Sequence, residues 1–243
     1  MKSQSRKILL PFTIVIVIVT LGAGLSKSQQ KPQPQTGVQT KESQAALTPQ
    51  QALDLLKAGN KRFAEGRMRN VDLREQARVT ASGQFPYAVI LSCQDSRTSS
   101  EILFDLNKGD AFSIRIAGNI INEDVLGGME FGVKLSGAKL IAVIGHTECG
   151  AIKGAIDNAE LGNLTALLSK IRPAMKTIPA NVQPGNSKNK TYVAMVAKEN
   201  VLLAMRQIRE RSPVLKEMID SGQIRLVGGM QDLETGKITF YED

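Results

Sequence analysis

Short apolar runs alternate along most of the chain with longer segments in which apolar residues recur at helical spacing. The runs are four to seven residues long, which is the length of a buried strand. The pattern predicts strands at residues 87–92, 111–117, 140–145, 224–227 and 237–241. It predicts helices at residues 48–66, 71–81, 98–104, 124–135, 150–156, 163–170 and 192–211. Nearly continuous apolar strands separated by helices indicate an α/β fold with a parallel sheet covered on both faces.

Capping residues mark two of the predicted helix starts. Thr48 is followed by Pro49, a pair that is typical of an N-cap and a first helical turn. We therefore expect a folded domain over residues 47–243. Thr98 stands three residues before Glu101, and this capping-box spacing predicts that a helix begins there.

The first 46 residues differ in composition from this domain. Lys2, Arg6 and Lys7 precede an apolar stretch at residues 8–25, and small residues gather at its end, so residues 1–26 are predicted to be a signal peptide. The protein is then exported and is periplasmic or otherwise extracytoplasmic. An uncleaved segment 8–25 would instead anchor it in a membrane. Residues 27–46 are rich in Gln, Lys, Ser and Pro, which predicts a flexible linker.

Composition argues against a nucleic-acid-binding protein. The formal net charge is +8, but three of the basic residues belong to the first seven positions. Aromatic residues make up 4% of the chain and tryptophan is absent, so there is no obvious platform on which bases could stack. We expect no nucleic-acid partner, and contact with a membrane only through an uncleaved N-terminal segment.

Candidate chemistry is concentrated in one histidine and two cysteines. His146 and Cys149 span a predicted strand-to-helix turn, and Cys93 follows the carboxyl end of another predicted strand, where parallel sheets form ligand sites. Two thiolates and an imidazole suit Zn²⁺ and leave a fourth position for water. A disulfide is the alternative in an exported protein. Asp95 and Arg97, which can pair side by side, favour the metal site because a disulfide needs neither.

Several short motifs together resemble the β-class carbonic anhydrases, here an exported bacterial-type member. The motifs are CQDSR at 93–97, GDAF at 109–112, RIAGN at 115–119, MEF at 129–131 and GHTECG at 145–150. The resemblance implies a core sheet of four parallel strands with an edge strand. It also implies an obligate homodimer, or a higher even oligomer, with the active site near the subunit interface.

The resemblance also assigns roles to individual residues. It implies zinc held by Cys93, His146 and Cys149, with Asp95 or water in fourth place. Asp95 and Arg97 are the implied catalytic pair, in which Arg97 decides whether Asp95 leaves the metal open. Residues implied to bind substrate are Gln84, Phe112, Ala117, Phe131 and Gly150. Plain core packing is the alternative for the glutamine, the two phenylalanines and the alanine.

The implied activity is zinc-dependent reversible hydration of carbon dioxide to bicarbonate and a proton by a zinc-bound hydroxide. The alternatives are a carbonyl sulfide or carbon disulfide hydrolase on the same scaffold, and a non-catalytic protein that binds bicarbonate or zinc. Glu148 is either a further carboxylate near the metal or a solvent-facing residue. With His146 as a ligand no second histidine is left to carry the proton away, so carboxylates, Tyr87 or external buffer must do so.

Overall fold

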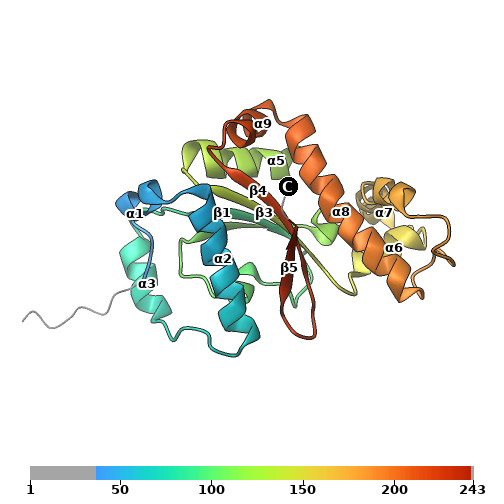
Figure 1. The fold of residues 1–243 in the computed structure, drawn as a ribbon, viewed down its shortest axis with the longest axis horizontal. Helices are drawn as coiled ribbons and strands as arrows, with labels where there is room; N and C mark the ends of the chain where they lie inside the picture. Colours follow the sequence, from blue (N-terminus) through green and yellow to red (C-terminus); the bar gives the residue numbers. More distant parts are fainter. Residues whose placement is uncertain (1–36, 242–243) are drawn as a thin grey trace, which may run out of the picture. The chain divides into compact units, whose positions relative to one another are not determined.

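A five-stranded sheet forms the centre of the computed structural model, which describes residues 37–241 (Figure 1). The strands are β1 (Ala88–Ser92), β2 (Ala111–Arg115), β3 (Leu140–His146), β4 (Arg225–Gln231) and β5 (Ile238–Tyr241). Their order is β2-β1-β3-β4-β5, in which the first four are parallel and β5 is antiparallel at the edge. The predicted α/β fold, with four parallel strands and an edge strand, is confirmed.

Helices cover both faces of this sheet (Figure 1). The α-helices are α1 (Lys41–Ala46), α2 (Pro49–Ala64), α3 (Leu73–Thr80), α4 (Ser100–Leu103), α5 (Glu123–Glu130), α6 (Gly150–Ile156), α7 (Gly162–Ser169), α8 (Lys190–Arg211) and α9 (Pro213–Asp220). Shorter turns are the 3₁₀ segments η1 (Ala117–Asn119) and η3 (Arg172–Thr177) and the π-helical η2 (Phe131–Leu135). The pattern predicted neither α9 nor η3, and the predicted helix 124–135 changes from α to π at Phe131.

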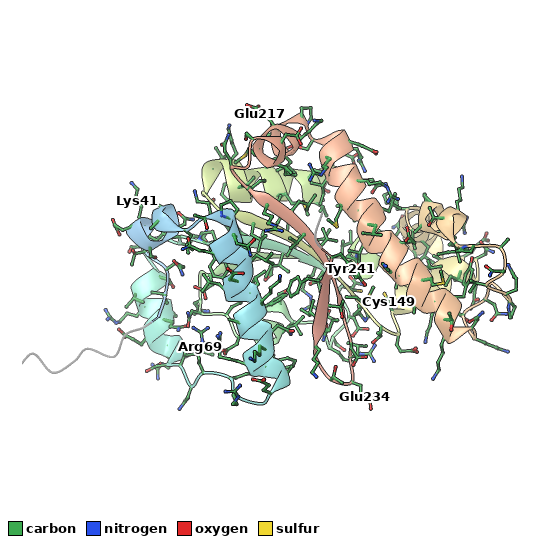
Figure 2. The ribbon with its side chains drawn as sticks, in the orientation of Figure 1. Lys41, Arg69, Cys149, Glu217, Glu234 and Tyr241 are labelled. Carbon is green, nitrogen blue, oxygen red and sulfur yellow. The ribbon has the colours of Figure 1, made fainter. Side chains whose placement is uncertain are left out.

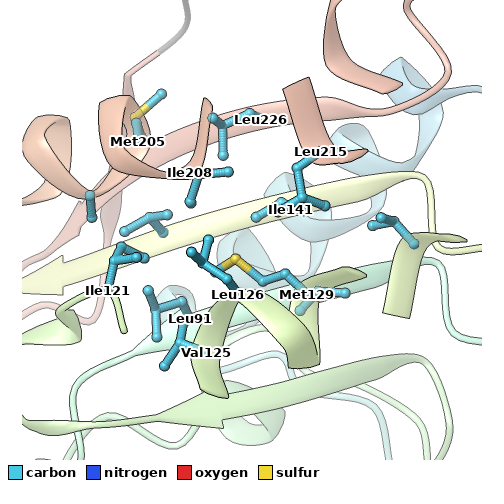
Figure 3. Close-up of a cluster of buried hydrophobic side chains, with 14 of the residues drawn as sticks. Leu91, Ile121, Val125, Leu126, Met129, Ile141, Met205, Ile208, Leu215 and Leu226 are labelled. Atoms are coloured by element: carbon cyan, nitrogen blue, oxygen red, sulfur yellow. The ribbon is translucent and has the colours of Figure 1, made fainter. Parts of the chain in front are cut away.

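Alternate residues of each central strand enter different cores. Val89 and Leu91 of β1 pack with α5, α8 and α9 in the cluster of Figure 3. Ala88 and Ile90 point to the opposite face and pack with α2. A third cluster, beyond the carboxyl edge of the sheet, joins Cys93 and Cys149 to α6, α7, η3 and α8. Both cysteines are buried in this third core.

The stretch predicted as a linker is helical where the structure describes it. Thr40 caps α1 through a capping box with Ser43. Gln44 is buried, and its Nε2 donates to the carbonyl oxygens of Pro86 and Ser136 at 2.6 and 2.7 Å. The tether prediction is therefore wrong for 41–46, because this helix is attached by hydrogen bonds rather than by an apolar face. Residues 1–36, with the predicted signal peptide, lie outside the described residues.

Two local sequence signals had other outcomes. Helix α4 begins after Ser99, and the Thr98 hydroxyl lies 2.9 Å from the carbonyl oxygens of both Cys93 and Asp95, to which it donates. The predicted capping box is therefore wrong, since Thr98 instead holds the loop after β1. Strand β4 continues through Gly228 to Gln231, beyond the predicted end at residue 227. A glycine is needed at position 228 because a Cβ there would lie 2.7 Å from the Met205 sulfur of α8.

Among the described residues, no helix is both long and apolar enough to cross a membrane.

Candidate metal centre

Two neighbouring strands deliver the three predicted ligands to one edge of the sheet. Cys93 directly follows β1, His146 is the last residue of β3, and Cys149 is the N-cap of α6 (Figure 2 labels Cys149). Strands β1 and β3 pair in parallel, so their carboxyl ends lie side by side. The predicted meeting of the three side chains follows directly from this pairing.

The geometry of the three side chains fits a metal ion. One ligand atom from each of Cys93, His146 and Cys149 lies within 4.8 Å of the others. The two sulfur atoms are 3.9 Å apart, about twice the length of a disulfide bond, and both cysteines are free. All three residues are at most 4% exposed. The disulfide alternative is therefore not the state of this structure.

His146 presents an unprotonated nitrogen to this cluster. Its Nδ1 lies 2.9 Å from the carbonyl oxygen of Thr147, which can only accept, so Nδ1 carries the proton. Its Nε2 is buried and has no hydrogen-bond partner among the described residues. Buried polar atoms without partners are rare, and a cation bound at Nε2 would supply the missing interaction.

Two anchors hold the loop between His146 and Cys149 to the β4–β5 hairpin. The Thr147 amide donates to the Gln231 carbonyl at 2.9 Å, and the Leu233 amide donates to Thr147 Oγ1 at 3.0 Å. Sequence reasoning assigned no role to Thr147; its place between two ligands was the available signal. The loop that carries two ligands is thereby fixed from outside its own segment.

The two thiols divide one proton between them. The hydrogen bond from Cys149 lowers the pKa of Cys93, and the hydrogen bond from the Gly118 amide acts in the same direction. Interaction with Cys93, together with burial, raises the pKa of Cys149. The site thus holds a thiolate beside a thiol, and a bound cation would displace the second proton.

Asp95 lies next to the triad but is bound to Arg97. Arg97 donates from Nε to Oδ1 at 2.9 Å and from Nη2 to Oδ2 at 2.7 Å, and its backbone amide also donates to Oδ1 at 3.0 Å. These hydrogen bonds hold the pKa of Asp95 well below its usual range. Asp95 Oδ2 is 4.0 Å from His146 Nε2. An ionised carboxylate therefore lies next to the candidate ligand atoms, while both of its oxygens accept hydrogen bonds from Arg97.

Arg115 fixes the backbone on which Cys93 and Asp95 stand. Its Nε donates to the Cys93 carbonyl at 3.2 Å and its Nη2 to the Asp95 carbonyl at 2.5 Å. No role was predicted for Arg115, although its position near the carboxyl end of the predicted strand 111–117 was a signal. Since β2 pairs with β1, the carboxyl end of β2 brings Arg115 to this loop.

The predicted substrate residues divide into two groups. Ala117, at the start of η1, and Gly150, at the start of α6, belong to the segments around the triad. The others, Gln84, Phe112 and Phe131, lie elsewhere on the chain. Of the predicted substrate residues, only Ala117 and Gly150 therefore belong to segments that adjoin the triad within the described residues of one chain.

The distant group lies along the β2 side of the sheet. Gln84 lines a hollow of about 480 Å³ together with Glu101. Phe112 pairs in register with Val89, three residues before the end of β1, and its ring centroid is 5.7 Å from that of the half-exposed Phe131. The substrate-binding role of these side chains stays a prediction.

Glu148 pairs with a lysine side chain at the surface. Its carboxylate forms an ion pair with Lys153, and its side chain is 48% exposed. The hydrogen bond from Lys153 lowers the pKa of Glu148. Of the two roles left open for this residue, the solvent-facing one matches the structure.

Known proteins with similar sequences and folds share one description. The profile of the carbonic anhydrase family matches residues 88–238. Carbonic anhydrase 2 of Mycobacterium tuberculosis is 33% identical over 190 residues, which are 78% of this chain and 91% of that protein. A carbonic anhydrase of Mycolicibacterium smegmatis is 30% identical over 191 residues, covering 78% of this chain and 92% of its own length.

Solved structures agree on the fold. The β-carbonic anhydrase CafA of Aspergillus fumigatus superposes with a TM-score of 0.63 at 25% identity, covering 79% of this chain and 89% of that chain. A tetrameric β-carbonic anhydrase of Sordaria macrospora gives a TM-score of 0.62 at 23% identity, covering 67% and 84%. With two sulfur atoms, one imidazole and the Asp95–Arg97 pair at the carboxyl edge of the same sheet, the chain belongs to the β-class carbonic anhydrase family.

Proposed function

We propose that this protein catalyses the reversible hydration of carbon dioxide to bicarbonate and a proton, with Zn²⁺ held by Cys93, His146 and Cys149. The observation that carries the proposal is the convergence of three buried ligand atoms within 4.8 Å, one of them an unpartnered imidazole nitrogen. Zinc in such a site supplies a water molecule whose pKa is lowered toward neutrality. The two thiolates balance the charge of the cation.

Asp95 and Arg97 keep the approach to this site polar and ordered. Arg97 occupies both carboxylate oxygens, so Asp95 stays ionised and is held away from the ligand atoms. In this position Asp95 can accept a hydrogen bond from the nucleophile and orient its lone pair toward carbon dioxide. A metal ion held by the three residues would then keep its fourth position for solvent.

The test combines metal analysis with rate measurements. Protein purified without chelators should contain one zinc per chain and hydrate carbon dioxide faster as the pH rises, and a strong chelator should abolish the rate. Cys149→Ser should lose both metal and rate, whereas the exposed Ser96→Ala should keep both. Zinc without hydration would leave a binding protein, and faster turnover of carbonyl sulfide or carbon disulfide would identify one of those hydrolases.

Dimerisation through the β2 side of the sheet is part of the proposal. Strand β2 is an edge strand, and next to it Phe131 and Leu135 of η2 are 50% and 77% exposed. Large apolar side chains left exposed beside an unpaired strand favour a protein partner. A second copy is the expected partner, as the tetrameric Sordaria enzyme is a structural relative.

We also propose that the protein acts outside the cytoplasm. The support is the sequence of residues 1–26, a basic start followed by an apolar stretch and small residues. Cell fractionation with N-terminal sequencing tests this: the chain should appear in the extracytoplasmic fraction, either cut near residue 26 or bound to membrane by an intact segment. Recovery of the full-length chain in the cytosol would contradict it.

A further inference from the structure

Helix α8 buries one polar residue in an otherwise apolar face. The buried positions of this helix include Val196, Ala197, Val201 and Ala204, and Asn200 lies among them with 2% of its surface exposed. A side-chain amide at such a position is unfavourable unless it is hydrogen-bonded. The partner of Asn200 therefore indicates why the helix carries an amide there.

That partner is a backbone carbonyl beside the metal centre. Asn200 Nδ2 donates to the oxygen of Gly118 at 2.7 Å, across 82 positions of sequence. Gly118 has a φ of +67°, and a Cβ there would lie 2.6 Å from Ile171 Cδ1, so no other residue fits this turn without a shift. Asn200 of α8 and Ile171, the N-cap of η3, thus both lie against Gly118.

Gly118 in turn contacts a ligand atom. Its backbone amide donates to Cys93 Sγ at 3.4 Å. A hydrogen bond to a thiolate stabilises the negative charge and reduces the electron density that the sulfur gives to a bound metal. The path from helix to ligand therefore runs from Asn200 through Gly118 to the sulfur of Cys93.

We propose that Asn200 is a positioning residue of the metal centre, which fixes Gly118 so that its amide stays directed at the Cys93 sulfur. The inference rests on the proposed metal site and adds a residue 107 positions from that ligand. Without the Asn200 amide, Gly118 can turn and its hydrogen bond to the Cys93 sulfur weakens. The negative charge on the sulfur is then less stabilised, and the sulfur is held less firmly at the position where the metal binds. Metal binding should therefore change in a variant that still folds.

The chain offers a matched control in Gln44. This residue is also a buried amide that donates to backbone carbonyls, but those belong to Pro86 and Ser136, which precede β1 and β3. The metal ligands follow the opposite, carboxyl ends of the same strands. Asn200→Leu and Gln44→Leu therefore remove comparable hydrogen bonds at opposite edges of the sheet, and both should lower stability.

The experiment compares Co²⁺-substituted wild type, Asn200→Leu and Gln44→Leu by absorption spectroscopy. In Asn200→Leu the sulfur-to-cobalt charge-transfer band should move to longer wavelength, and metal affinity, measured by competition with a chromogenic chelator, should fall about 10- to 100-fold. Gln44→Leu should keep the wild-type spectrum and affinity. Where Asn200→Leu does not fold, Asn200→Ala is the second variant, because the smaller side chain leaves room for a water molecule.

Two results would overturn the inference, and they differ from failure of the proposed function. An unchanged spectrum and affinity in a folded Asn200 variant would show that the amide serves packing alone. Equal changes in Asn200→Leu and Gln44→Leu would show a general loss of rigidity. If wild-type protein binds neither Co²⁺ nor Zn²⁺, the metal site itself is wrong and both proposals fall together.

Discussion

Arg97 is hydrogen-bonded to Asp95, and we expect it to control whether this carboxylate can reach the candidate metal ligands. In Arg97→Ala the carboxylate loses both donors of the guanidinium and is free to turn toward the ligand atoms 4.0 Å away. We expect hydration to fall by about tenfold or more while zinc content stays near one per chain. Stopped-flow rates together with metal analysis measure both quantities.

A matched control for Arg97 exists on helix α3. Arg78 donates from Nε and Nη2 to the two carboxylate oxygens of Glu75, a fork of the same geometry on the surface. Arg78→Ala should leave hydration and zinc content at wild-type values. Full turnover of a zinc-loaded Arg97→Ala variant would refute the role given to Arg97.

Asp110 gives stability a pH dependence of unusual sign. This carboxyl is 3% exposed, its Oδ1 has no hydrogen-bond partner among the described residues, and burial raises its pKa from 3.8 to about 6. The folded state then favours the protonated form of Asp110. The contribution of this group to the free energy of unfolding is therefore complete below about pH 4 and is lost as the pH rises through about 6.

Asp110→Asn removes this titration because an amide stays neutral. The free energy of unfolding of the variant minus that of wild type should rise between about pH 4 and about pH 8, by about 3 kcal/mol at most. Urea unfolding of the two proteins across this range measures the difference. A difference that does not change with pH would show that Asp110 is ionised in the same way in both states.

At the scale of elements, α1 is attached to the domain by a single polar side chain. Gln44 bridges the carbonyls of Pro86 and Ser136 and thereby ties the segments before β1 and before β3. Gln44→Leu leaves both carbonyls without this donor and should lower the free energy of unfolding by about 1 to 3 kcal/mol. Lys41→Leu, at an exposed position of the same helix, should change it by less than about 0.5 kcal/mol in urea titrations.

The helices and strands also show which elements the pattern of apolar positions predicted and which it missed. All five strands lie where apolar runs predicted them. The signal is most continuous in β1 and β3, which are buried along their whole length and therefore need apolar residues on both faces. Helix α1 was missed because its sequence, KESQAA, has no apolar face. The extension of β4 through Gly228 was missed because the close approach of α8 requires a glycine there, and glycine usually signals a strand end.

At the scale of the whole molecule, the proposed dimer predicts different effects for two similar leucines. Leu135 beside β2 is 77% exposed, and Leu161 at the N-cap of α7 is 71% exposed. Leu135→Lys should shift the protein from dimer to monomer in sedimentation velocity, because a charge at an apolar interface is unfavourable. Leu161→Lys should remain dimeric. Dimers that resist Leu135→Lys would place the interface elsewhere.

The sequence by itself determined the α/β fold and the three candidate metal ligands. Strand-length apolar runs set the first, and three rare side chains after strand ends, with Asp95 and Arg97 beside one of them, set the second. Only the tertiary structure decided which distant residues support the site. Asn200 and Arg115 reach it because α8 crosses the sheet and β2 pairs with β1. Such contacts join residues whose separation in sequence has no period, so no local pattern predicts them.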